Sequence, residues 1–153
     1  MRINSLLVLC AALYSTNNYA LTPDAIQGKA LYPACHVCHD QVTSLPLGPP
    51  MWGVQSRYIR NSLDKEGFVK SMTTFVKAPT LKSAIHEEAV DKLGLMPAMP
   101  LPDNILNKIA TYIFEEKFPP PCEHWKITVE NAVIDGDMEH AEKVERQLQR
   151  FCN

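Results

Sequence analysis

The stretch Cys35-His36-Val37-Cys38-His39 decides the interpretation of this chain, because a histidine directly follows the second of two closely spaced thiols. A C-x-x-C-H sequence is the attachment signature for c-type haem. On one helical turn, two such thiols can form thioethers with two vinyl groups on one porphyrin edge, and the histidine can then ligate the iron. The pattern therefore predicts one haem c, bound covalently through Cys35 and Cys38, with His39 on the metal.

Three other interpretations of this stretch are less favoured. A redox dithiol usually lies in a βαβ unit, and the sequence offers no such context. Half of a zinc site, with His36 or His39 among its ligands, needs a second ligand pair at a characteristic spacing, which is absent. A small disulfide within the stretch would contribute little to stability. We interpret His36, which lies between the cysteines, as a solvent-facing residue.

The N-terminal segment, residues 1–20, has the features of a secretory signal peptide. Arg2 supplies a short positive region, residues 6–14 form an unbroken apolar run, and Ala20 is a small residue suited to cleavage. The run is too short to span a bilayer, so we expect no transmembrane span in the mature chain. These features predict an exported, periplasmic protein from which Cys10 is removed with the signal.

Charge and cysteine content narrow the possibilities further. The 153 residues suffice for one domain with a small appendage. The chain has 15 basic and 17 acidic residues, and loss of Arg2 with the signal brings the net charge to −3. This mild charge does not indicate nucleic-acid binding. Four cysteines remain, and the distant pair, Cys122 and Cys152, is free to form a disulfide after export.

The pattern of apolar residues predicts an all-α protein, since no segment alternates with the period of a strand. Capping residues, apolar stripes and prolines place the expected helices at residues 22–32, 64–76 and 87–93 and from residue 103 onward. Gly94 suits the positive φ that commonly ends a helix. Residues 95–102 include three prolines and should be extended.

A different segment follows Pro119-Pro120-Pro121, which is a stiff break. Two further helices are expected on either side of a turn at residues 135–137. If these helices run antiparallel, Cys122 at the start of the first meets Cys152 at the end of the second. A disulfide there would contribute roughly 2–4 kcal/mol.

The order of these motifs resembles that of class I cytochromes c. Residues 28–32 followed by the pentapeptide resemble the family's first helix and haem site, and residues 48–53 resemble its Gly-Pro loop. Residues 95–97 and 103–114 resemble its methionine loop and last helix. The resemblance covers residues 22–118, and it implies a haem domain over residues 21–118 with a helical hairpin extension over residues 119–153.

The resemblance also implies roles for individual residues. Met96 is the expected second axial ligand, with Met99 as the alternative, because Met96 leaves the longer path to the last helix. The backbone carbonyl of Pro49 is expected to accept a hydrogen bond from the proximal histidine, which would fix its ring. Gly28 should allow the first helix to cross the last closely near Tyr112. For Trp52 we favour ordinary core packing over a contact with the haem.

An iron held by six ligands leaves no position for a substrate, so the expected function is electron transfer rather than catalysis. The chain would carry one electron at a time between a redox donor and an acceptor that dock transiently. Four lysines in the middle third are candidates for a weak docking patch, although a solvated helix face explains such a run more often; they are Lys65, Lys70, Lys77 and Lys82.

Two alternative functions remain open. The first is a fixed haem subunit of a larger redox complex, with the hairpin as its docking element. Exposure of Trp125 and Phe151 would favour this function, and burial of both would favour a cover over the domain. A ligand-binding haem sensor or small haem enzyme would require an open sixth iron site. His86 as a replacement axial ligand is a minor alternative.

Overall fold

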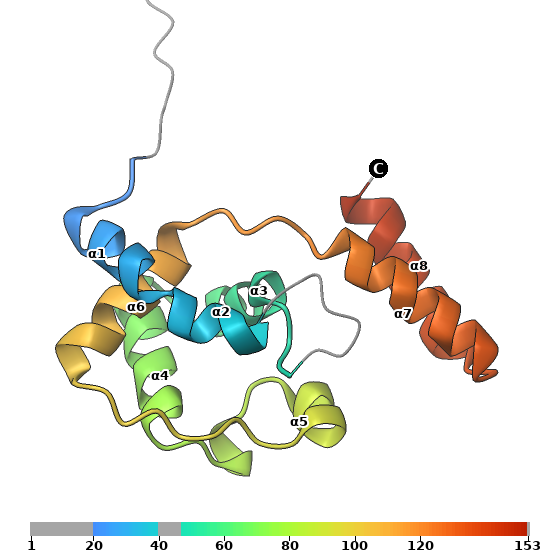
Figure 1. The fold of residues 1–153 in the computed structure, drawn as a ribbon, viewed down its shortest axis with the longest axis horizontal. Helices are drawn as coiled ribbons and strands as arrows, with labels where there is room; N and C mark the ends of the chain where they lie inside the picture. The colour runs from blue at the N-terminus through green and yellow to red at the C-terminus, as the bar shows by residue number, and fades with distance from the viewer. Residues whose placement is uncertain (1–19, 40–46, 153) are drawn as a thin grey trace, which may run out of the picture.

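The computed structural model describes residues 20–39 and 47–152, and every regular element within these ranges is helical. The predicted signal peptide therefore lies outside the described residues apart from Ala20. In chain order the elements are α1 (Pro23–Leu31), α2 (Pro33–His39), α3 (Met51–Asn61), α4 (Lys65–Lys77), the 3₁₀ turn η1 (Leu81–Ser83), α5 (Glu87–Leu93), α6 (Asp103–Glu115), α7 (Cys122–Ile134) and α8 (Met138–Phe151) (Figure 1). The all-α prediction is confirmed.

The crossing of α1 and α6 forms one side of the core. The Thr22 side chain caps α1 by accepting a hydrogen bond from the Ala25 amide, as its position before proline predicted. At Gly28 the two helices touch through their backbones: a Cβ built there would lie 1.9 Å from the carbonyl oxygen of Lys108. The same Cβ would lie 2.9 Å from the Cβ of Tyr112. The expected close crossing near Tyr112 is therefore present.

Helix α4 packs on the other side of α6 through its predicted apolar face. Phe68 is completely buried, and Met72 is buried one turn later. The ring of Phe68 makes edge contacts with Tyr58 of α3 and Phe114 of α6. Asp64 caps the helix by accepting a hydrogen bond from the Gly67 amide. The core thus lies between α1, α3, α4 and α6.

Helix α3 is an element that the sequence interpretation missed. Pro49, Pro50 and Gly53 favoured a loop, since glycine and proline disfavour helix interiors. Proline is nevertheless tolerated at the entry to a helix, and Pro50 is the N-cap of α3. The signal for a helix was the i, i+4, i+7 spacing of Met51, Gln55 and Tyr58, all of which are buried.

The connection from α4 to α6 largely has the helix end and the extended segment that the sequence predicted. The short helix α5 ends at Gly94, whose φ of 81° is the left-handed conformation expected there. Residues 95–102 contain no regular element. Pro102 is the N-cap of α6, and no side chain caps this helix. The Asp103 carboxylate instead pairs with Lys77.

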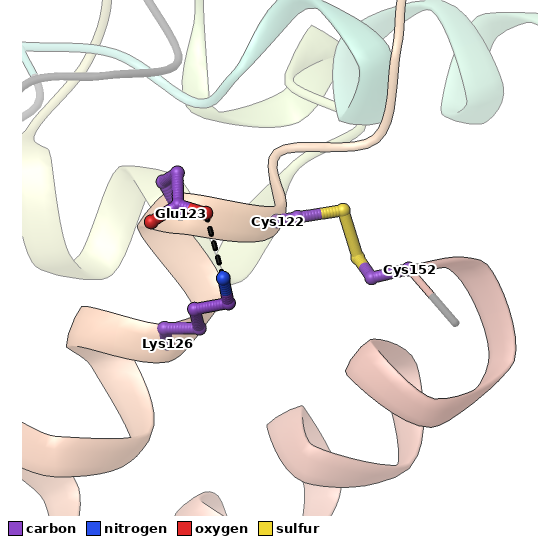
Figure 2. Close-up of a disulfide and its surroundings, with 4 residues drawn as sticks. All are labelled: Cys122, Glu123, Lys126 and Cys152. Carbon is purple, nitrogen blue, oxygen red and sulfur yellow. Dashed lines mark hydrogen bonds and ion pairs between the residues drawn. A yellow bond between two sulfur atoms is a disulfide. The ribbon is translucent and has the colours of Figure 1, made fainter.

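The C-terminal hairpin forms as predicted, and a disulfide joins Cys122 at the start of α7 to Cys152 just after α8 (Figure 2). Figure 1 shows α7 and α8 lying side by side at one end of the molecule. Their contact is made by buried residues that include Ala132, Ala141 and Val144. Apolar side chains near the turn are exposed and lie outside this interface; they are Val133, Ile134 and Met138.

The hairpin rests on the bundle at its disulfide end. Trp52 of α3 makes edge contacts with Trp125 and Phe151, with ring centroids 5.3 and 5.1 Å apart. Trp125 is buried, whereas Phe151 remains 41% exposed. The two side chains therefore meet neither the condition set for a docking element, exposure of both, nor the condition set for a cover, burial of both. Because both rings pack on Trp52, this end of the hairpin covers the domain. Lys143 of α8 adds an ion pair with Glu88 of α5.

Candidate cofactor site

The pentapeptide lies on α2, immediately after the end of α1. Tyr32 closes α1, and its carbonyl accepts hydrogen bonds from the amides of Cys35 and His36, so the chain enters α2 without a gap. Cys35 and Cys38 are both free thiols and both half-buried. Burial raises the pKa of the Cys35 thiol, and the nearby Cys38 raises it further. The two thiols thus lie on one helical turn beside the core.

His39, the last residue of α2, is fixed by the loop that precedes α3. Its Nδ1 lies 2.7 Å from the carbonyl oxygen of Pro49, so in the tautomer with hydrogen on Nδ1 the ring donates this bond. Gly48 lies against the same ring: a Cβ built there would be 3.0 Å from Cε1 of His39. Burial lowers the pKa of His39, while the Pro49 carbonyl acts in the opposite direction. A neutral imidazole so oriented keeps Nε2 available for a metal.

An apolar cavity adjoins these groups, and the five helices α2 to α6 all contribute to its wall. Cys35, Cys38 and His39 lie on one part of this wall. The apolar lining comes from aliphatic, aromatic and methionine side chains of α3 to α6 and includes Val54, Tyr58, Met72, Val76, Ile109 and Ile113. An apolar cavity with a few convergent polar groups is the usual form of a cofactor site.

Both candidate methionines line this cavity and both are half-buried. Met96 and Met99 belong to the extended segment before α6. The backbone of Met99 is tied to the end of α4, because its amide donates a hydrogen bond of 2.9 Å to the carbonyl of Val76. Its own carbonyl accepts a hydrogen bond from the amide of Leu101.

Other residues considered from the sequence lie elsewhere. Trp52 is not among the residues that line the cavity, and it packs on the hairpin instead, which agrees with the favoured packing role. His36 is exposed, with its ring at the edge of Tyr32. Two of the four lysines of the suggested docking patch are neutralised by ion pairs, Lys65 with Glu115 and Lys77 with Asp103. The lysine run is therefore a poor docking patch.

His86 is a residue of the cavity wall that the sequence placed only among minor alternatives. It precedes α5, and its Nε2 is buried with no hydrogen-bond partner among the described residues. Burial lowers the pKa of His86, and the charge of Arg57 adds to this effect, while the backbone of Gly53 opposes it. Nothing in the local sequence around this histidine indicated that it would lie on the cavity wall.

The chemistry of the site fits haem better than zinc. Across residues 20–39 and 47–152, no three histidine, cysteine or acidic side chains gather as a metal site. Two free thiols and one oriented imidazole on the wall of an apolar cavity match instead the attachment groups and the apolar surroundings that haem c requires. Gly48 strengthens the match, because a side chain there would press on the His39 ring.

Comparison with known proteins gives a partial relationship. The chain is 39% identical over 64 residues to a cytochrome c-553-like protein of Synechocystis sp. (strain ATCC 27184 / PCC 6803 / Kazusa). The match covers 36% of this chain and 61% of the relative's length. No family model and no solved structure matches the chain. The similarity supports a c-type cytochrome.

A helix that spans a bilayer must be both long and predominantly apolar. In the part of the chain that the structure describes, no helix meets both requirements.

Proposed function

We propose that this chain is a single-haem c-type cytochrome that carries one electron at a time between exported redox proteins. The observation that carries the proposal is the meeting of Cys35, Cys38 and His39 on the wall of one apolar cavity. The similarity to a cytochrome c-553-like protein supports the same class. Bound haem would supply an iron couple that takes up and releases one electron. This transfer needs no substrate-binding site on the protein.

The residues of the site would each perform a distinct task. The two thiols of α2 hold the porphyrin edge covalently, so the group is not lost after export. His39 provides the proximal ligand, and the Pro49 carbonyl keeps its ring oriented and raises its basicity. The apolar wall excludes water, and a low dielectric constant around the metal favours the state of lower charge.

For the second axial ligand we propose Met96, with Met99 as the alternative. A thioether ligand raises the reduction potential of the iron. Two observations support Met96. The last helix begins at Asp103, seven residues later, which leaves the chain room to leave the haem face. The backbone of Met99 is held against the end of α4, which suits a wall residue better than a ligand that must reach the metal.

Export and transient docking belong to the same proposal. The predicted signal peptide places the mature chain in the periplasm, where a donor and an acceptor would meet the exposed edge of the haem. Because Lys65 and Lys77 are paired, we do not assign docking to the lysine run. With four porphyrin nitrogens, the His39 imidazole and the Met96 thioether as ligands, the iron would have no free position for catalysis.

A fixed subunit of a larger redox complex is the second candidate. The observation in its favour is the exposed apolar end of the hairpin, where Val133, Ile134 and Met138 gather around the turn. The cover formed by Trp125 and Phe151 on Trp52 favours the free carrier. A ligand-binding haem sensor has the weaker support, because both methionines reach the cavity.

The test is an absorption spectrum of the mature protein, made in a host that attaches c-type haem. Oxidised and reduced spectra are recorded for the wild type and for Met96→Leu and Met99→Leu. We expect covalent haem and the weak far-red band of sulfur-ligated ferric iron, lost in Met96→Leu and kept in Met99→Leu. The reverse pattern would assign Met99 as the ligand.

Two controls separate the alternatives. Carbon monoxide should not bind the reduced wild-type protein, since a firmly held methionine resists displacement; ready binding would favour the sensor. A Cys35→Ser, Cys38→Ser variant should hold no covalent haem. If the wild type also holds none, the proposed function is wrong.

A further inference from the structure

One polar atom on the wall of the apolar cavity lacks a partner. Nε2 of His86 is buried, and it makes no hydrogen bond of ordinary geometry with a described residue; the backbone of Gly53 lies near enough to raise the pKa of the ring but does not satisfy this nitrogen. A buried polar group left unpaired costs about 1–3 kcal/mol, and such groups are uncommon in native proteins. Because His86 lines the cavity, a group bound in the cavity is the natural source of the missing partner.

The position of His86 argues against iron ligation. Its ring lies against the first turn of α3: a Cβ built on Gly53 would be 3.7 Å from Nε2. Gly53 follows closely after Pro49, whose carbonyl contacts the proximal His39. A sixth ligand must approach the iron from the side opposite His39. Proximity to α3 therefore places His86 at the rim of the bound group rather than at its sixth iron position.

The surroundings of His86 favour an anion. Arg57, one turn after Gly53, donates a hydrogen bond of 3.3 Å to the carbonyl of Ile85, directly before His86. No ion pair joins Arg57 to an acidic residue within the described ranges. The nearby acid on α5, Glu88, is paired with Lys143 at 2.8 Å. Arg57 is not itself among the residues that line the cavity, but its positive charge lies next to the corner where His86 offers an unused ring nitrogen.

We propose that Nε2 of His86 donates a hydrogen bond to a carboxylate of the bound haem, with Arg57 as the neighbouring positive charge. The two propionate carboxylates are the anionic part of a group whose remaining surface is mostly apolar, and the cavity has the same division between apolar wall and polar corner. His86 is then a positioning residue that fixes how the haem lies and neutralises part of its charge. The inference rests on the proposed function.

The test compares His86→Phe, which removes the donor, with His86→Gln, which keeps an N–H group. His124→Phe is the matched control, because His124 is also half-buried but does not line the cavity. Each protein is purified with its haem, and mass spectrometry establishes covalent attachment. The reduction potential is then measured, together with redox-difference infrared spectra on haem labelled with ¹³C at both propionate carboxylates.

We expect His86→Phe to shift the labelled carboxylate bands and to lower the reduction potential. A carboxylate without its donor is more negative and stabilises ferric iron, so the reduction equilibrium should fall several-fold. His86→Gln should restore most of both signals, and His124→Phe should leave both unchanged.

Unchanged carboxylate bands in a haem-loaded His86→Phe protein would overturn the inference and leave the proposed function intact. Loss of the far-red sulfur band in His86→Phe would also overturn it, by showing that this residue controls the iron ligands. A wild-type protein without covalent haem would overturn the proposed function, and this inference with it.

Discussion

Replacing Gly28 by alanine should destabilise the protein although alanine is the better helix former. The added methyl carbon would lie 1.9 Å from the carbonyl oxygen of Lys108 and 2.9 Å from the Cβ of Tyr112. Neither atom can move by side-chain rotation, because one belongs to the backbone of α6 and the other is fixed to it. Helices α1 and α6 must therefore separate, and the packing of Tyr32 on Tyr112 must loosen.

The magnitude follows from two opposed terms. Overpacking of a tight core typically costs about 1–3 kcal/mol, and the backbone contact places Gly28→Ala at the upper end. The gain in helix propensity returns up to about 1 kcal/mol. The free energy of unfolding should thus fall by about 2 kcal/mol, which corresponds to roughly 4–8 °C in the melting temperature. Denaturant titration and thermal melting of the haem-loaded protein measure both quantities.

Gly67→Ala is the matched control, since Gly67 lies in the first turn of α4 away from another helix. A Cβ there would lie 3.3 Å from the Asp64 carboxylate oxygen that accepts the Gly67 amide, a side-chain atom that can shift by a small amount without breaking this cap. We expect this variant to be as stable as the wild type or slightly more stable. If Gly28→Ala behaves like Gly67→Ala, the close crossing of α1 and α6 does not limit the fold and our reasoning is refuted.

Three further predictions concern stability. Changing Cys122 and Cys152 to serine opens a cross-link with a sequence separation of 30 residues, so the free energy of unfolding should fall by about 3.5 kcal/mol in denaturant titrations; an unchanged midpoint would contradict this. Gln55→Leu removes a buried amide that donates to two carbonyls at the end of α6, each 2.6 Å away, and should cost about 2 kcal/mol by the same assay, whereas a neutral result would mean that the carbonyls find other donors. Burial raises the pKa of Glu115, but hydrogen bonds from Lys65 and the start of α1 outweigh this and hold it below its ordinary value. Its stabilising effect is therefore present above pH 4.5 and lost as the pH falls through the lowered pKa, so Glu115→Gln should flatten the decline of melting temperature with acid; an equally steep decline would exclude this role.

Local sequence signals predicted the helices that begin or end at a clear capping residue. Thr22 and Asp64 cap α1 and α4, because their side-chain oxygens accept hydrogen bonds from amides of the same turn. Gly94 ends α5, because a residue without a side chain readily adopts positive φ. Helix α3 was missed for the opposite reason. Its helical conformation depends on burying Met51 and Tyr58 against other helices, and this tertiary contribution outweighs the proline and glycine near its start.

The site shows the same division between local and long-range information. Covalent attachment through Cys35 and Cys38, with His39 beside them, follows from one short motif. The ion pairs of Lys65 and Lys77 join elements far apart in the chain, so sequence spacing did not reveal them. The unpartnered nitrogen of His86 depends on how α3 and the segment before α5 meet, which no local pattern specifies.

The hairpin packs on the two elements that meet at His86. Trp52, which receives Trp125 and Phe151, directly precedes Gly53, the residue against which the His86 ring lies. On α5, Glu88 lies two residues after His86 and pairs with Lys143 of the hairpin. The disulfide lies at the end of the hairpin that makes the aromatic contacts, so the extension touches both α3 and α5 beside the cavity. We therefore expect the hairpin to stabilise the polar corner of the cavity while its apolar turn stays exposed.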